Sequence, residues 1–204
     1  MTKFRRVSVL TAAAVVVTIM ATGCVQGHTD PTPSPSASSP KPTSSSIASP
    51  TSSDDAWVQA NKTIESFTQI QYQIEHDSGA DVDRIDVIAT NGARSSMQQI
   101  ASDLSAKGLK IIGGAPTWEP NAAASSFGTL IDSNGKSYPD GIVYARGCWD
   151  LSKQSSMAST GTPPPDRSVK VFPIQFNVAY SPELRTWRVT DQTNITGQSG
   201  APQC

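Results

Sequence analysis

The stretch 168–195, SVKVFPIQFNVAYSPELRTWRVTDQTNI, carries the strongest fold signal in the chain. Residues 168–180 alternate large apolar and polar side chains, which is the period of a strand with one buried face. Residues 181–186 read as a turn, and residues 187–195 read as a second strand. Pro173 cannot donate a hydrogen bond to a sheet, so it requires an edge position or a bulge. The stretch therefore predicts an antiparallel hairpin.

Further strands are predicted before this hairpin. Residues 109–118 read as one strand that is interrupted by a bulge at Gly113-Gly114. Residues 127–132 lead into the turn 133–136, in which Asn-Gly is a strong hairpin signal. Residues 142–151 alternate well enough for another strand. The C-terminal half of the chain is therefore predicted to form an antiparallel sheet.

A long amphipathic helix is predicted to begin at residue 54. Asp54 and Asp55 are suited to cap its start, and Gly79 is expected to end it. Apolar side chains recur at steps of three and four residues, which is the helical period. They are Trp57, Ala60, Ile64, Phe67, Ile70 and Ile74.

Two shorter helices are predicted between the long helix and the strands. The first covers residues 82–89, and the second covers residues 93–107 with Gly108 as its C-terminal stop. Helices that are followed by an antiparallel sheet indicate the α+β class. We therefore expect residues 54–204 to form an α+β domain whose N-terminal helices pack on a bent antiparallel sheet.

The N-terminus has the order of a secretory signal. Lys3, Arg5 and Arg6 precede the uncharged apolar stretch 7–20, which is shorter than the roughly 20 residues that a membrane-spanning helix needs. Residues 21–24, Ala-Thr-Gly-Cys, resemble the bacterial lipobox, although Leu-Ala is commoner than Ala-Thr at its first two positions.

The lipobox resemblance implies that residues 1–23 are removed and that Cys24 carries a lipid. The bilayer would then be a partner of the chain through acylated Cys24, because two or three acyl chains anchor stably. An ordinary signal peptide with an incidental cysteine is the alternative.

The segment 24–53 is expected to be a disordered tether. After Val25 it contains six prolines, many Ser and Thr, and Ile47 as its one large aliphatic residue. Such a composition buries too little apolar surface to offset the entropy of ordering. The tether would hold the domain away from the membrane.

Charge argues against nucleic acid as a partner. The chain has 16 basic and 17 acidic residues, and loss of residues 1–23 removes three basic residues and no acidic ones. The mature chain then has a net charge of about −4. No basic run survives to contact phosphates, which dominate nucleic-acid affinity.

Three cysteines are an odd number for an exported protein. If Cys24 carries lipid, Cys148 and Cys204 remain, and an extracytoplasmic location allows them to form a disulfide. Two free, buried thiols are the alternative.

The chain resembles small lipoproteins of actinobacterial cell envelopes whose folded part is similar to the NTF2-like cone. The matching features are the lipobox, the Ser/Pro/Thr spacer, the helix-first order, GCWD at 147–150 and TWRVTD at 186–191 with the terminal Cys204. The resemblance implies a long helix across a strongly bent antiparallel sheet that forms a cone with room for a pocket.

Candidate pocket residues follow from that resemblance. NTF2-like enzymes that move protons use an acid inside the cone with a Tyr or a second acid beside it. Asp150 would be the base here, with Tyr72 or Tyr144 as the donor, and Trp118 would line the pocket. No histidine pair has metal-ligand spacing, and no cofactor motif is present, so neither a metal nor a cofactor is expected.

The leading hypothesis is a lipid-anchored, extracytoplasmic protein that is not an enzyme and binds a small ligand or an envelope protein. One alternative is an acid–base enzyme that works in the cone. The other is a structural component of an envelope or secretion complex, which would expose a large apolar patch.

Overall fold

The structure is a computed structural model that describes residues 48–159 and 169–204. The predicted signal peptide, the predicted lipidation site Cys24 and most of the predicted tether lie outside the described residues. The three longest helices of the described residues are α1 (Ser53–His76), the 3-10 helix η1 (Val82–Val87) and α2 (Asn91–Lys107). All three precede every strand that the described residues form, so the predicted element order is confirmed.

Helix α1 begins with a reciprocal cap. The side chain of Ser52 accepts a hydrogen bond from the backbone N–H of Asp55 at 3.1 Å, and Asp55 accepts one from the backbone N–H of Thr51 at 3.1 Å. Ser52 is the N-cap residue, so the predicted capping role is confirmed for Asp55, which takes part in the cap, and not for Asp54. Both acids lie in the first turn, where their negative charges interact favourably with the positive end of the helix dipole.

The main sheet contains five antiparallel strands in the order β2-β4-β6-β7, with β3 also paired to β4. Their bounds are β2 (Thr117–Pro120), β3 (Ser126–Ile131), β4 (Ser137–Asp150), β6 (Val171–Ser181) and β7 (Thr186–Asn194). A separate ribbon pairs β1 (Leu109–Gly113) with β5 (Gln154–Ala158). The α+β class and the antiparallel pairing are confirmed.

The region around Gly113 differs from the prediction. Residues 109–118 do not form one bulged strand, because β1 and β2 belong to different sheets. Gly113 has a φ of +102°, and a Cβ there would lie 2.0 Å from the carbonyl oxygen of Lys153. A side chain at this position would therefore collide with the chain that leads into β5. Strand β5 itself was not predicted, because its residues are mostly small and polar.

Pro173 lies inside β6, between β4 and β7, without disrupting the sheet. The last pair of β6 with β7 joins Ile174 to Asn194, so Pro173 lies just beyond the ladder on that side. Its carbonyl oxygen still accepts a hydrogen bond from the backbone N–H of Ile195 at 3.1 Å. Its missing N–H faces the same side and costs no ladder bond.

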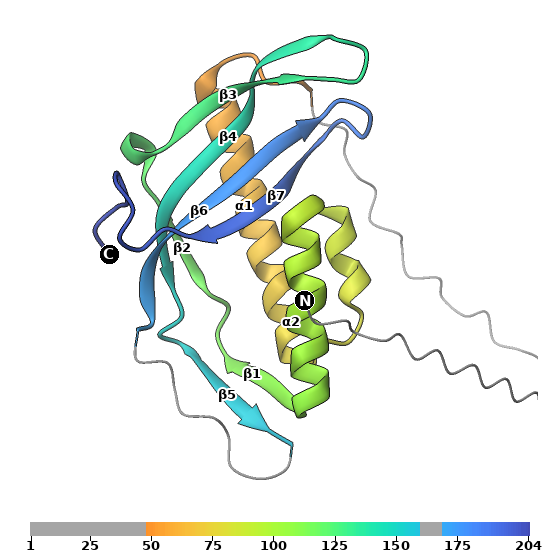
Figure 1. Ribbon diagram of the computed structural model, residues 1–204, viewed down its shortest axis with the longest axis vertical. Helices are drawn as coiled ribbons and strands as arrows, with labels where there is room; N and C mark the ends of the chain where they lie inside the picture. Colours follow the sequence, from red (N-terminus) through yellow and green to blue (C-terminus); the bar gives the residue numbers. More distant parts are fainter. Residues whose placement is uncertain (1–47, 160–168) are drawn as a thin grey trace, which may run out of the picture. The chain divides into compact units, whose positions relative to one another are not determined.

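The core forms where α1 crosses the inner face of the sheet. Figure 1 shows α1 and α2 on the same face of the sheet, and the β1–β5 ribbon extends beyond the end of the sheet. Phe176 of β6 lies at the centre, with ring centroids 6.0 Å from Phe67, 5.1 Å from Trp118 and 5.3 Å from Trp149. Gly147 makes room for Trp118, because a Cβ there would lie 2.5 Å from the Trp118 ring.

Strand β7 contains a bulge that reverses which side chains face inward. Before the bulge, Val189 is opposite Val178, and Val189 is fully buried. Beyond it, Gln192 is opposite Phe176, and Asn194 is opposite Ile174, so both amides take the inward register. A β-bulge adds one residue to one strand and re-aims the side chains that follow.

The C-terminal tail is held on the outer face of the sheet. Cys148 and Cys204 form a disulfide with their Cα atoms 5.6 Å apart, across a sequence separation of 56. This is the pair that the sequence analysis expected. Arg146, also on the outer face of β4, donates to the carbonyl oxygen of Gly200 at 3.3 Å.

Candidate functional site

A cavity of about 350 Å³ lies between the C-terminal part of α1, helix α2, the β1–β5 ribbon and the adjacent end of the main sheet. Its apolar lining consists of Ile100, Leu104, Ile111, Trp149, Leu151, Phe172 and Ile174. Its polar lining consists of Gln71, Glu75, Ser96, Gln154, Gln192 and Asn194. A concave site with mostly apolar walls and a few polar groups is the usual form of a small-molecule site.

The floor of the cavity carries a buried polar pair on α1. Gln71 and Glu75 are 6% and 8% exposed, and they lie four residues apart on the same helix face. Gln71 Nε2 donates a hydrogen bond to Glu75 Oε1 at 2.8 Å. The preceding buried side of α1 is mainly apolar, with Ala60, Ile64 and Phe67, but it also includes Thr63 and Thr68. Ile74, which lies between Gln71 and Glu75 in the chain, is fully buried as well, so the cavity end of α1 carries both polar and apolar buried side chains.

Two buried polar atoms of the lining have no hydrogen-bond partner. They are Oε1 of Gln71 and Nε2 of Gln154. A buried polar atom without a partner costs about 1–3 kcal/mol, so native structures contain few of them. Both atoms belong to side chains that line the same cavity, which is where a bound molecule could complete their hydrogen bonding.

The β7 bulge supplies the remaining amides. Gln192 and Asn194 enter the lining because the extra residue in β7 shifts the alternation by one position. The strand predicted over residues 187–195 has no bulge, so the prediction includes neither Gln192 nor Asn194 in a site. No residue type in TWRVTDQTN signals the shift, since the signal is the pairing with β6.

The structure does not bring the four candidate pocket residues together. Tyr72 lies on α1, but its hydroxyl donates to the carbonyl oxygen of Gly113 at 2.6 Å, and Tyr72 does not line the cavity. Trp118 packs on Phe176, and its Nε1 donates to Asn61 Oδ1 at 3.0 Å. Trp118 lines a different hollow, of about 310 Å³, beside α1.

Tyr144 and Asp150 share the outer face of β4 with Cys148, since alternate residues of the strand point away from the core. The backbone N–H of Ser152 donates to Asp150 Oδ1 at 2.7 Å. This hydrogen bond, followed by that of the Ser152 side chain, holds the pKa of the Asp150 carboxyl below its ordinary value. Asp150 is therefore a weak base, and it lies on the outer face of the sheet, away from the cavity. The carboxyl that lines the cavity is that of Glu75, which the prediction missed.

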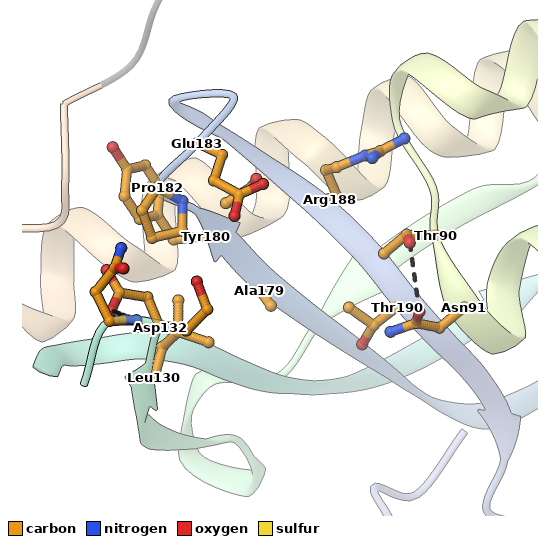
Figure 2. Close-up of a pocket in the computed structure, with 13 residues that line it drawn as sticks. Thr90, Asn91, Leu130, Asp132, Ala179, Tyr180, Pro182, Glu183, Arg188 and Thr190 are labelled. Atoms are coloured by element: carbon orange, nitrogen blue, oxygen red, sulfur yellow. Dashed lines mark hydrogen bonds between the residues drawn. The ribbon is translucent and has the colours of Figure 1, made fainter. Parts of the chain in front are cut away.

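A further hollow, separate from the one that Trp118 lines and also of about 310 Å³, opens at the other end of the sheet. Figure 2 shows it between Leu130 and Asp132 of the β3–β4 hairpin, Pro182 and Glu183 of the β6–β7 turn, and the start of α2. The positively charged side chain in its lining is that of Arg188, which donates hydrogen bonds to the backbone carbonyl oxygens of Asp86 and Ala89. Arg188 thereby holds the segment before α2 against β7.

The two findings that follow hold for residues 48–159 and 169–204, which the structure describes. In these ranges, no group of three or more His, Cys, Asp or Glu side chains is placed to hold a metal ion. In the same ranges, no helix combines the length and the apolar character that crossing a bilayer requires.

Comparisons with known proteins give no family for this chain. No model of a protein family matches it, and no curated protein matches it. Among solved structures, it is similar to the intermembrane space region of the chloroplast protein ARC6, with a TM-score of 0.43 and 12% sequence identity. That alignment covers 66% of this chain and 92% of the ARC6 region. A likeness at this level says nothing of function.

Proposed function

We propose that the protein is a lipid-anchored, extracytoplasmic lipoprotein whose α+β domain, which resembles the NTF2-like cone, binds a small molecule in the cavity between α1, α2 and the sheet. The observation that carries the proposal is the pair of buried, unpartnered polar atoms, Gln71 Oε1 and Gln154 Nε2, in a cavity with largely apolar walls. A molecule in the cavity can supply the hydrogen bonds that these two side chains do not find within the described chain.

The proposed location rests on two features at opposite ends of the chain. The lipobox-like residues 21–24 supply the anchor through Cys24. The Cys148–Cys204 disulfide supports an oxidising compartment, because disulfides persist mainly outside the cytoplasm. A membrane-held, oxidised domain is the expected product of a lipoprotein pathway.

Fractionation of the producing cells tests the anchor. The wild-type chain is expected in the membrane fraction with an acylated Cys24 as the first residue in mass spectra. Cys24→Ala is expected to move the folded domain out of that fraction. Equal membrane retention of Cys24→Ala, or a mature N-terminus elsewhere without fatty acid, contradicts the anchor.

Native mass spectrometry of the protein purified from its own membranes tests the cavity. A bound small molecule is expected in the wild type. Ile100→Trp fills the cavity from α2 and is expected to abolish that adduct. Gln99→Trp, at the exposed neighbouring position, is the matched control and is expected to keep it. An adduct that survives Ile100→Trp lies elsewhere and contradicts the proposed site.

Glu75 gives the enzymatic alternative one specific group. It is a buried carboxyl in the cavity, the kind of environment in which enzymes place a catalytic acid or base. Under that alternative, the co-purified molecule is turned over, and Glu75→Gln stops turnover while binding persists. A molecule that stays chemically unchanged on prolonged incubation with the protein argues for binding alone.

A further inference from the structure

We infer that the cavity selects an uncharged molecule with a carboxamide-type group, one N–H donor beside one C=O acceptor, on a small apolar or aromatic body. The inference rests on the proposed function, because it names the ligand class for the same cavity. It is carried by the hydrogen-bonding state of Gln71 and Gln154 and by the walls that surround them.

The free atom of Gln71 is an acceptor. Its Nε2 donates a hydrogen bond to Glu75 Oε1 at 2.8 Å. Oε1 is therefore the end without a partner, on a side chain that is 94% buried. A ligand has to present a donor to it.

The free atom of Gln154 is a donor. Gln154 begins β5, opposite Gly113 of β1, so it reaches the cavity from the ribbon and not from α1. Its Nε2 is buried without a hydrogen-bond partner. A ligand has to present an acceptor to it.

Hydrogen-bond inventories separate the chemical classes. A carboxylate has acceptors only, so it leaves Gln71 Oε1 without a partner. An ammonium group has donors only, so it leaves the Nε2 of Gln154 without a partner. A carboxamide presents both kinds of group and brings no net charge into a cavity with apolar walls. A hydroxyl also has a donor and acceptors, but they share one oxygen. A carboxamide offers its donor and its acceptor on two atoms, which suits two side chains that reach the cavity from different elements.

The walls define the rest of the molecule. Trp149, Phe172 and Ile174 line the sheet side, and Ile100 and Leu104 line the α2 side. These surfaces favour an apolar or aromatic body. A volume of about 350 Å³ lies near the lower end of the range for ligand pockets, which favours a small molecule.

Four probes that share one ring test the inference: benzamide, benzoate, benzylamine and toluene. Binding is measured by equilibrium dialysis of the full-length protein in lipid nanodiscs against empty nanodiscs, so that partition into lipid cancels. Nanodiscs that hold the Ile100→Trp variant, in which the cavity is filled, measure how much of each probe binds outside the cavity. Benzamide is expected to bind about tenfold or more tightly than each other probe, since each net hydrogen bond contributes about 1 kcal/mol.

Two variants assign the preference to the two glutamines. Gln71→Met and Gln154→Met keep similar volume and remove the amide, and Gln99→Met on the surface of α2 is the control. Gln71→Met and Gln154→Met are each expected to weaken the affinity for benzamide about fivefold to tenfold and to leave the affinity for toluene unchanged. The control is expected to change neither affinity.

The outcomes distinguish the ligand class from the proposed function. Benzoate or benzylamine that binds as tightly as benzamide overturns the carboxamide class, and so does a benzamide affinity that both glutamine variants leave unchanged. Either result keeps the cavity as a binding site if binding is lost in Ile100→Trp. If no probe binds in the wild type and the native protein also carries no adduct, both proposals fail. The probe series uses the wild type, so it remains informative if a variant does not fold.

Discussion

The inner face of the sheet has two regions that use the same helix and the same strands differently. In the packed region, Phe67 of α1 meets Phe176 of the sheet, with ring centroids 6.0 Å apart. Both belong to one core cluster with Val178 and Trp187, and each of these four residues is at most 1% exposed. In the hollow region, Gln71 and Glu75 of α1 face Trp149 and Ile174 across a cavity of about 350 Å³.

The difference arises from one turn of helix and one extra residue of strand. On α1 the buried side chains before the cavity include Ile64 and Phe67, whereas at the cavity Gln71 and Glu75 are buried beside Ile74. On β7 the bulge turns Gln192 and Asn194 inward in place of an apolar continuation. Close packing requires complementary apolar shapes from both layers, so the layers part where both become polar. A binding cavity can thus be built from the same elements as the core.

The largest expected effect comes from truncation in the packed region. Phe176→Ala removes the ring that contacts Phe67, Trp118 and Trp149, and it is expected to lower the free energy of unfolding by about 3–5 kcal/mol. Phe172→Ala, which is half-buried in the wall of the hollow region, is the matched control and should cost clearly less. Urea unfolding followed by tryptophan fluorescence measures both. Equal costs would show that the two regions are packed alike.

A smaller effect is expected from the disulfide, which lies on the opposite face from both regions. Cys148→Ser with Cys204→Ser is expected to lower the free energy of unfolding by about 2–4 kcal/mol, because the cross-link restricts the unfolded chain. Benzamide affinity should not change, since neither cysteine lines the cavity. Urea unfolding and the dialysis assay check the two statements. A loss of affinity would link the tail to the hollow region.

The smallest effect is expected from Gln154→Met, and its sign is opposite. The variant removes a buried donor that has no partner and adds apolar contact, so the free energy of unfolding should stay equal or rise by about 0.5–1 kcal/mol. The same variant is expected to weaken the affinity for benzamide. A gain in stability together with a loss of binding is expected of a binding residue. A clear loss of stability without ligand would show that the amide is structural.

The local elements of the fold were largely predictable. The apolar steps from Ala60 to Ile74 identified α1, and Gly108, with a φ of +59°, ended α2 as expected. The turn at Asn134-Gly135 and the hairpin of β6 and β7 also follow from local residue types. Each of these signals works within a few residues, where backbone preference and side-chain period act directly.

The cavity was not predictable from local residue types. Tyr72 and Trp118 were chosen for their chemistry, but the first binds the carbonyl oxygen of Gly113 and the second binds Asn61. Gln71 and Glu75 looked like ordinary polar positions of an amphipathic helix. Their burial depends on α2 and the β1–β5 ribbon, which close over that end of α1.

The sequence by itself determined the α+β class, the helix-first order and the cysteines that were available to pair, because periods, turns and counts are properties of short segments. Only the tertiary structure decided which side of β7 faces inward after Val189, where α1 leaves the sheet, and which polar atoms lack partners. Those features depend on pairing and packing between segments far apart in the chain. Their energy is set by contacts that no single segment contains.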